Sequence, residues 1–410
     1  MKILHIADIH LGKSFSTKEE SLREFLVNNH KETFRNGIEY AISTNIDGVL
    51  IAGDLFENLE FSFRTEKFVV DEFNRLKKAG IPVFYCSGNH DYTSELSAVR
   101  KIDYPDNVHL FFDETPKVVE IENRYRVVGC GHNNRKEGRD LIAEYPRSDK
   151  DGIWIGIGHS MIDSILSDGT EGAYMHSSIE TLLDKEYDYW ALGHIHQSGR
   201  IDPRVPAYYS GSMQGLNPKE IGQKGGNLIT FSPSGEINVE CIQFSPMEWE
   251  AVEIKIGDKL ETLKDIYDYI FGKINDHLES GGRKANTVLL RVRLTGRHPL
   301  ATRINESVLL LDYAEEIKLD LDLVHAELIS EVKQLYSLEA LTSANSILAE
   351  MLKSMETEEA LETFVSNMGD IKLLNTTEME QGKEHYIKDK VAESVDAIIG
   401  RFMEDMNEIS

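Results

Sequence analysis

Five apolar, strand-like runs in the first 200 residues each end in a small residue followed by side chains that can bind metal ions. The clearest run is residues 49–52, which Gly53 and Asp54 follow directly. A carboxylate at the end of a buried strand is costly unless a charged group neutralises it. If the five strand ends meet at one point, their polar side chains would hold two metal ions, with Asp54 placed to bridge both. The candidate ligands are Asp8, His10, Asp54, Asn89, His159, His194 and His196.

These candidate ligands divide into two groups that share Asp54. One ion would take Asp8, His10, Asp54 and His196, and the other would take Asp54, Asn89, His159 and His194. Two divalent ions bring more positive charge than the two aspartates return, so the pocket would attract phosphate. The ions would polarise phosphate oxygens and activate a water molecule for hydrolysis at neutral pH. Mixed oxygen and imidazole ligands suit manganese, iron or zinc better than calcium.

Two further residues follow directly after the candidate ligand Asn89. His90 is placed either to protonate the leaving oxygen or to stabilise charge on the phosphoryl group. Asp91 could orient a neighbouring imidazole. A single Asp-x-His or Gly-His motif is a weak signal, because ordinary polar turn residues at strand ends look the same. The ordered set of five motifs is a strong signal, and it predicts a hydrolytic site.

Three regions with different sequence patterns must position this site. Residues 1–245 alternate apolar runs with helical patterns, near 19–44 and 63–78 for example, which predicts an α/β domain. Open α/β sheets gather ligands at their strand ends, which suits this arrangement. Residues 246–333 follow a β-α-β-α-β pattern, typical of a small α+β capping domain, and residues 334–410 are almost wholly helical in pattern.

Composition narrows the class of protein. The 410 residues are enough for two or three domains, and no apolar run is long enough to span a membrane. The sequence begins at once with a strand-like run, so we expect no signal peptide. Three cysteines without metal-site spacing are typical of a reducing cytoplasm. The net charge of −26 argues against non-specific binding to nucleic acid, but it is unevenly distributed and does not describe the active face.

Three sequence motifs also resemble those of a known family. They are Ala-Asp-Ile-His-Leu-Gly at residues 7–12, Gly-Asp-Leu-Phe at residues 53–56, and the run from Tyr209 through Glu220 to Gly225. Together with the five strand ends, they are similar to motifs of the calcineurin-like metallophosphoesterases. More narrowly, they resemble the SbcD-type nucleases that repair DNA double-strand breaks, and the bacterial YhaO-like exonuclease group.

This resemblance implies a sandwich of two sheets flanked by helices, followed by the capping domain and the helical C-terminal region. It implies two manganese ions and hydrolysis of DNA phosphodiester bonds in repair, by an exonuclease that could also act as an endonuclease. It further implies an SMC-like coiled-coil ATPase as partner, often a homodimer, and a place in the bacterial cytosol near the nucleoid.

One residue departs from the family pattern. Several nucleases of the wider family carry a histidine three residues after the bridging aspartate, where this chain has Glu57. The exchange removes an imidazole from the neighbourhood of the substrate and would affect the rate and direction of digestion. Alternatively, Glu57 is simply a carboxylate at the start of a helix.

The most basic stretch of the chain is a candidate DNA contact. It contains Arg283, Lys284, Arg291 and Arg293, and the two strand arginines share one face while aliphatic residues share the other. Such a strand could pack on one side and meet a phosphate backbone on the other. The alternative is a solvated face paired with local acids, because residues 246–333 contain more acidic than basic residues.

Apolar residues spaced by three or four form one stripe in the C-terminal region, namely Ile387, Val391, Val395, Ile398, Phe402 and Met406. A helix with this stripe could dock on the coiled-coil partner or pack on its own domain. Two other functions remain open for the whole chain. One is a phosphoesterase acting on small molecules, cyclic nucleotides or phosphoproteins, and the other is a regulatory subunit that binds DNA ends and has weak nuclease activity.

Overall fold

The computed structural model describes residues 1–17, 19–58, 61–95, 97–121, 125–162, 175–280 and 287–335. Two compact units are distinguished by their internal contacts. The first comprises Met1–Ala251, Leu278–Arg291 and Leu321–Ala326, and the second comprises Val252–His277, Val292–Asp320 and the described residues from Glu327 onward. The apolar stripe predicted for the C-terminal region lies outside the described residues.

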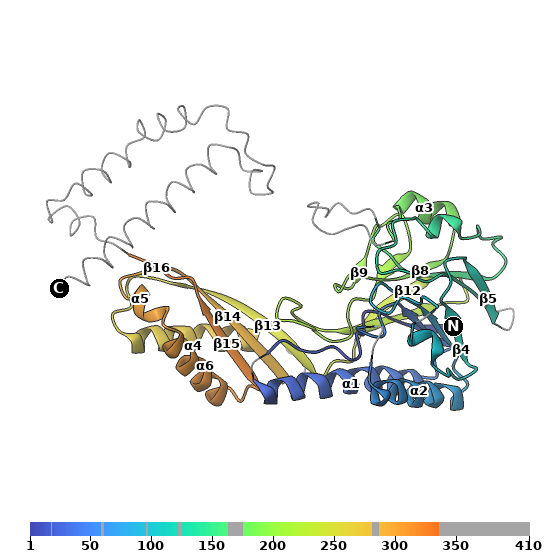
Figure 1. Ribbon diagram of the computed structural model, residues 1–410. Helices are drawn as coiled ribbons and strands as arrows, with labels where there is room; N and C mark the ends of the chain where they lie inside the picture. Colours follow the sequence, from blue (N-terminus) through green and yellow to red (C-terminus); the bar gives the residue numbers. More distant parts are fainter. Residues whose placement is uncertain are drawn as a thin grey trace, which may run out of the picture. The chain divides into compact units, whose positions relative to one another are not determined.

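Six strands form the first sheet of the first unit (Figure 1). Their order is β12 (Ile237–Gln243), β11 (Gly225–Phe231), β1 (Lys2–Ile6), β2 (Gly48–Ala52), β3 (Val83–Cys86) and β4 (Val108–Phe111). Strands β1 to β4 are parallel, whereas β11 is antiparallel to both β1 and β12. Because β1, β2 and β3 are adjacent and parallel, their carboxyl ends lie at the same edge of the sheet.

Six more strands form the second sheet of this unit. Their order is β5 (Lys117–Ile121), β6 (Tyr125–Gly129), β7 (Ile153–His159), β8 (Tyr189–Gly193), β10 (Ala207–Tyr209) and β9 (Gly199–Arg200). The four central strands are parallel, and the two outer strands β5 and β9 are antiparallel to their neighbours.

The two sheets pack face to face around an apolar core. Every residue of β2 is buried, and successive side chains of a strand point to opposite faces. Leu50 accordingly clusters with Ile155 and Tyr189 of the second sheet. Val49 and Ile51 belong to a different cluster on the outer face of the first sheet. A continuous apolar run of this kind is typical of a strand buried on both sides.

Helices cover the outer faces of both sheets (Figure 1). Helices α1 (Glu20–Ser43) and α2 (Phe63–Lys78) pack on the first sheet, and α3 (Ile179–Lys185) packs on the second. The start of α2 is capped, because the Ser62 side chain accepts a hydrogen bond from the backbone amide of Thr65. The sandwich of two sheets flanked by helices confirms the predicted fold class.

The remaining described residues contain the expected β-α-β-α-β elements, with a short helix and a two-residue strand in addition. In chain order the elements are β13 (Met247–Ile256), α4 (Leu263–Ser280), β14 (Thr287–His298), α5 (Ala301–Ile304), α6 (Ser307–Asp320), β15 (His325–Ser330) and β16 (Lys333–Gln334). Strands β13, β14 and β15 form a sheet in that order, and β16 pairs with β14. Within the described ranges, none of the helices combines the length and the apolar character needed to cross a membrane.

Candidate metal centre

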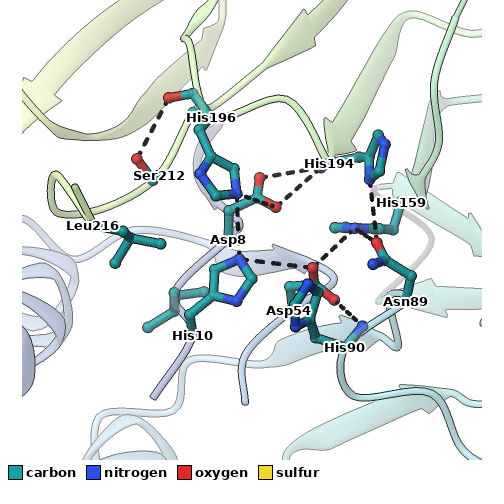
Figure 2. Close-up of polar contacts among 12 residues, drawn as sticks. Asp8, His10, Asp54, Asn89, His90, His159, His194, His196, Ser212 and Leu216 are labelled. Atoms are coloured by element: carbon teal, nitrogen blue, oxygen red, sulfur yellow. Dashed lines mark hydrogen bonds and ion pairs between the residues drawn. The ribbon is translucent and has the colours of Figure 1, made fainter. Parts of the chain in front are cut away.

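The seven predicted ligands all lie at the carboxyl ends of strands from the two sheets of the first unit, and Figure 2 shows their side chains together. The first sheet contributes Asp8 and His10 after β1, Asp54 after β2 and Asn89 after β3, and the second contributes His159 at the end of β7 and His194 and His196 after β8. The structure therefore brings together all seven side chains that the strand-end motifs singled out.

The backbone at this edge of the sandwich is unusual. Four of the seven residues have positive φ angles: Asp8 (49°), His10 (53°), Asp54 (50°) and His194 (97°). Such angles are uncommon outside glycine and concentrate at functional sites. The strand ends also approach each other closely, since a Cβ atom on Gly193 would lie 1.9 Å from the carbonyl oxygen of Ala52. Only glycine fits at that position.

The first group of side chains is formed by Asp8, His10, Asp54 and His196. The Nε2 atoms of His10 and His196 lie 3.3 Å apart. The Nε2 atom of His10 is 3.7 Å from Oδ2 of Asp54, and that of His196 is 3.8 Å from Oδ1 of Asp8. The Asp8 carboxylate also accepts hydrogen bonds of 3.1 Å from the backbone amide of His194. Two carboxylates and two imidazole nitrogens thus face one small volume.

The second group is formed by Asp54, Asn89, His159 and His194. The Nε2 atom of His159 lies 3.0 Å from Oδ1 of Asn89 and 3.2 Å from Oδ2 of Asp54. The Nδ1 atom of His194 lies 3.2 Å from the same Asn89 oxygen. Because Oδ2 of Asp54 faces both His10 and His159, Asp54 occupies the position between the two groups (Figure 2).

The donor set of this site fits divalent metal ions. One potential ligand atom from each of Asp8, His10 and His196 lies within 4.8 Å of the others, and the same holds for Asp8, Asp54 and His159. The side chains of Asp8 and Asp54 are almost completely buried, and the partners found for their oxygens are imidazoles and backbone amides. Buried carboxylates arranged with imidazole and amide donors are a typical ligand set for manganese, iron or zinc.

The pair formed by Asp54 and His159 is strongly polarised. Burial opposes protonation of His159, but the adjacent Asp54 carboxylate outweighs it and raises the pKa of His159 to about 10. Burial likewise opposes ionisation of Asp54, yet His159 holds the pKa of Asp54 well below its usual value. The proton on His159 therefore neutralises Asp54 in the absence of a cation, and a bound cation must replace that proton.

Asp91 has a different position from the one we expected. We expected it to orient an imidazole, but its hydrogen-bond partners are backbone amides and the hydroxyl of Tyr85. Its carboxylate accepts hydrogen bonds of 2.7 Å from the amide of Leu55 and 2.6 Å from that of Gly88. Asp91 thus joins the loop after β2, which carries Asp54, to the loop after β3. Most of these partners are backbone amides, which cannot be identified from the sequence.

Glu57 lies beside the first group, and the alternative interpretation as a helix start is wrong. It lies in a loop, and α2 begins only at Phe63. Its Oε2 atom is 2.7 Å from Nδ1 of His10, and its Oε1 atom is 3.1 Å from Nζ of Lys13. Burial opposes ionisation of Glu57, but His10 and Lys13 outweigh it and lower its pKa to about 2.

His90 lies at the rim of the site, and its side chain is 26% exposed. Its Nδ1 atom is 2.9 Å from the backbone carbonyl oxygen of Glu57. Its backbone amide donates a hydrogen bond of 2.9 Å to Oδ1 of Asp54. Since a carbonyl oxygen only accepts, Nδ1 of His90 carries the proton of this contact, and Nε2 remains for other partners.

A second carboxylate, Glu220, contacts His196 of the first group. Its Oε1 atom lies 3.0 Å from Nδ1 of His196. Burial raises the pKa of Glu220, but the hydrogen bond and charge of His196 outweigh it, so the net shift is downward. From the sequence, Glu220 was recognised only as part of a motif that resembles a family motif. Its contact with His196 could not be inferred because the fold alone brings the two together.

The candidate DNA-contact residues belong to another part of the chain. Arg283 and Lys284 lie outside the described residues. Along β14 the predicted alternation is present, since Leu290, Val292 and Leu294 are buried, Arg291 is half-buried and Arg293 is exposed. The guanidinium of Arg293 forms ion pairs with Glu331 and Glu253. The pairing with local acids that we considered as the alternative is therefore present at Arg293.

Comparison with known proteins places this site in a family. Residues 1–198 match the family model of the calcineurin-like phosphoesterases. The chain is 28% identical to the uncharacterized metallophosphoesterase YhaO of Bacillus subtilis, over 73% of this chain and 72% of that protein. It is 30% identical to the DNA double-strand break repair protein Mre11 of Sulfurisphaera tokodaii, over 65% of this chain and 70% of that protein.

A second Mre11 protein, from Sulfolobus acidocaldarius, is 24% identical over 87% of this chain and 91% of its own length. These matches confirm the resemblance inferred from the strand-end motifs, and the donor set described above agrees with them. The chain belongs to the calcineurin-like metallophosphoesterases, a family of hydrolases that cleave phosphoester bonds with two divalent metal ions.

Proposed function

We propose that this protein is a nuclease that uses two metal ions to hydrolyse phosphodiester bonds of DNA during repair, chiefly as an exonuclease. The observation that carries the proposal is the convergence of seven side chains around Asp54, at a site where two buried carboxylates face imidazole nitrogens. Similarity to proteins named as DNA double-strand break repair proteins supports DNA as the substrate.

The proposed metal ligands follow the two groups of side chains. One position consists of Asp8, His10, Asp54 and His196, and the other of Asp54, Asn89, His159 and His194. We propose Mn²⁺ for both, because carboxylate, amide and imidazole donors are mixed here. When bound, such ions polarise phosphoryl oxygens and lower the pKa of a coordinated water. Asp91 supports the site by holding the loop of Asp54 in place.

The proposed role of His90 follows from its contacts. Its Nδ1–H donates to the carbonyl oxygen of Glu57, which fixes the ring plane and leaves Nε2 for the substrate. The ring lies edge-on to that of His10, with centroids 4.8 Å apart, so it is next to the proposed metal position. In the imidazolium form Nε2 donates a proton or a hydrogen bond to a phosphate or leaving oxygen.

The rest of the chain is assigned within the same proposal. Residues 1–245 act as the nuclease domain, residues 246–333 as a capping domain, and residues 334–410 as a docking segment. The arginines of β14, with Arg283 and Lys284, contact the DNA backbone, while the docking segment binds an SMC-like coiled-coil ATPase. A homodimer and a place in the bacterial cytosol complete the proposal, and the names of the Mre11 relatives support a role in DNA repair.

A second function is favoured by one observation. Arg293 is paired with Glu331 and Glu253, and the net charge of the chain is −26, so the surface of β14 is less positive than its sequence suggests. A phosphoesterase acting on small phosphoesters would need no basic surface. The same two-metal site would serve either substrate.

One experiment separates the two functions. Purified wild type and the His90→Gln variant are assayed on end-labelled DNA and on a small phosphodiester, with Mn²⁺, with Mg²⁺ and with chelator. We expect DNA cleavage with Mn²⁺ that is lost in chelator and strongly reduced by His90→Gln. Turnover of the small ester alone would favour the second function, and cleavage that persists in chelator would contradict both.

A further inference from the structure

The histidines of the proposed metal site differ in the group that lies next to the ring nitrogen Nδ1. In the first group, Nδ1 of His10 is 2.7 Å from a carboxylate oxygen of Glu57, and Nδ1 of His196 is 3.0 Å from a carboxylate oxygen of Glu220. In the second group, Nδ1 of His159 is 2.9 Å from the backbone carbonyl oxygen of Ala52. Two imidazoles of the first group therefore have a carboxylate with a full negative charge next to Nδ1, whereas His159 has a neutral carbonyl group there.

The proposed ligands themselves also make the first group more negative than the second. The first group contains both aspartates, Asp8 and Asp54, whereas the second contains Asp54 and the neutral amide of Asn89. A carboxylate behind an imidazole fixes its tautomer, aims the other nitrogen at the metal and makes it a stronger donor. Each nearby negative charge also attracts a cation directly, and most strongly where water is excluded.

Other contacts hold both carboxylates in place. Glu57 is held through its second oxygen by Nζ of Lys13, at 3.1 Å. Glu220 accepts hydrogen bonds of 2.9 Å from the Ser212 hydroxyl and 3.1 Å from the amide of Leu216. Their side chains are only 17% and 12% exposed, respectively. These contacts keep each carboxylate next to Nδ1 of its histidine.

Glu57 has a second connection, to His90. Its backbone carbonyl accepts the hydrogen bond from Nδ1 of His90 while its side chain contacts His10. The same residue thus touches a proposed metal ligand and the imidazole proposed to face the substrate. Atoms of His10, Glu57 and His90 also lie close enough to hold a cation of their own. The ammonium group of Lys13 on Glu57 disfavours a third cation there, because the like charges repel.

We infer that Glu57 and Glu220 are positioning residues that make the Asp8–His10–Asp54–His196 position the tighter of two unequal metal sites. The inference rests on the proposed two-metal site, but not on the identity of the substrate.

The test is a titration of the metal-free, full-length protein with Mn²⁺, followed by calorimetry and by electron paramagnetic resonance of the bound ion. We expect two binding phases of different affinity in the wild type. Glu57→Gln and Glu220→Gln should each weaken the tighter phase by about 10- to 100-fold, the usual effect of losing an outer partner of a metal ligand. Asn89→Ala should weaken only the looser phase.

A matched control comes from a buried carboxylate remote from the site. Glu72 is paired with Arg35 and Arg75, and Glu72→Gln should leave both phases unchanged. Thermal unfolding without metal verifies that each variant folds, and Glu57→Asp replaces any variant of Glu57 that does not. The shorter Asp side chain keeps the charge but withdraws it from His10, so it should also weaken the tighter phase.

The possible outcomes are distinct. Two ions bound with equal affinity, or an effect of Glu57→Gln confined to the looser phase, would overturn the inference while leaving the proposed nuclease intact. A third bound ion that is lost in Glu57→Gln would show that Glu57 is itself a ligand and would overturn the inference. If Mn²⁺ binds as expected but no DNA is cleaved, the inference holds and the proposed function fails. If no Mn²⁺ binds, both fail.

Discussion

The proposed metal centre and strand β14 both carry charged residues, but their surroundings differ. At the metal centre, Asp8 and Asp54 are almost completely buried and face imidazoles that come from distant strands. On β14, the side chain of Arg293 is 53% exposed, and its guanidinium pairs with the nearby acids Glu331 and Glu253. One set of charges is concentrated away from water, and the other is neutralised at the surface.

This difference shows which sequence patterns carry functional information. A buried carboxylate needs a partner of opposite charge, so several of them at separate strand ends imply that the fold brings them together for a purpose. An exposed arginine can pair with any acid in reach, at a gain of about 1 kcal/mol or less. A charge pattern along one strand therefore predicts a surface but not its ligand.

The largest effect is expected at Asp54, whose oxygen faces both groups of ligands. Asp54→Asn removes the negative charge that both proposed metal positions share, so the variant should lose Mn²⁺ and its activity together. The loss of rate should exceed the roughly 10²- to 10⁴-fold that one proton-transfer group contributes. Metal content and the initial rate of DNA cleavage measure the two effects. The control is Asp71→Asn on α2, where Asp71 pairs with Lys67 away from the proposed ligands, and it should leave both quantities unchanged. Two ions retained by Asp54→Asn would contradict the shared position.

A smaller effect is expected at His90, at the rim of the same site. His90→Gln keeps a hydrogen-bond donor but cannot release a proton, so kcat should fall by about 10²- to 10⁴-fold. Mn²⁺ affinity should stay within a few-fold of wild type, because His90 is not among the proposed ligands. A parallel measurement of kcat and of Mn²⁺ binding separates the two quantities. If metal affinity fell as much as kcat, His90 would belong to the metal site itself.

Metal removal should give the metal centre a pH dependence of stability. The pKa of His159 is raised to about 10 by Asp54, well above the value near 6.5 of an unfolded chain. A raised pKa stabilises the folded state fully below pH 6.5, and this contribution disappears as pH rises through 10. The metal-free protein should therefore lose a few kcal/mol of stability between pH 6.5 and 10.

Urea unfolding at a series of pH values measures this loss, and His159→Gln is the matched variant. The variant lacks the titrating group, so its stability should change less over the same range. The metal-loaded wild type should not show the decline, because a bound cation needs a neutral imidazole and binds better as pH rises. A flat profile for the metal-free wild type would mean that the Asp54–His159 pair does not form without metal.

The same comparison explains what the sequence could and could not predict. Asp54 and Asn89 were identifiable because each lies within three residues of the end of an apolar run whose strand character was clear. Helices α1 and α2 were predicted from the helical sequence patterns near residues 19–44 and 63–78. The supporting role of Glu57 was not predictable, because its partners His10, Lys13 and His90 are set by the tertiary fold.

Strand pairing was the other feature that sequence reasoning could not supply. Strand β11 lies next to β1, although more than 200 residues separate them in the chain. Local patterns do not contain that information, since apolar alternation gives the face of a strand but not its neighbour. The convergence of the seven candidate ligands was predicted nonetheless, because each strand end carried its own signal.

The smallest effect is expected on β14. If Arg293 contacts a DNA phosphate, Arg293→Ala should weaken DNA binding less than about 10-fold and reduce the salt slope by about 1. The effect is limited because Glu331 already neutralises the guanidinium. Glu331→Gln should have the opposite sign, since it frees Arg293 to meet a phosphate and should tighten binding. DNA affinity measured at several salt concentrations tests both variants. If neither variant changes the salt slope, Arg293 does not contact DNA, and its guanidinium is a solvated group paired with local acids.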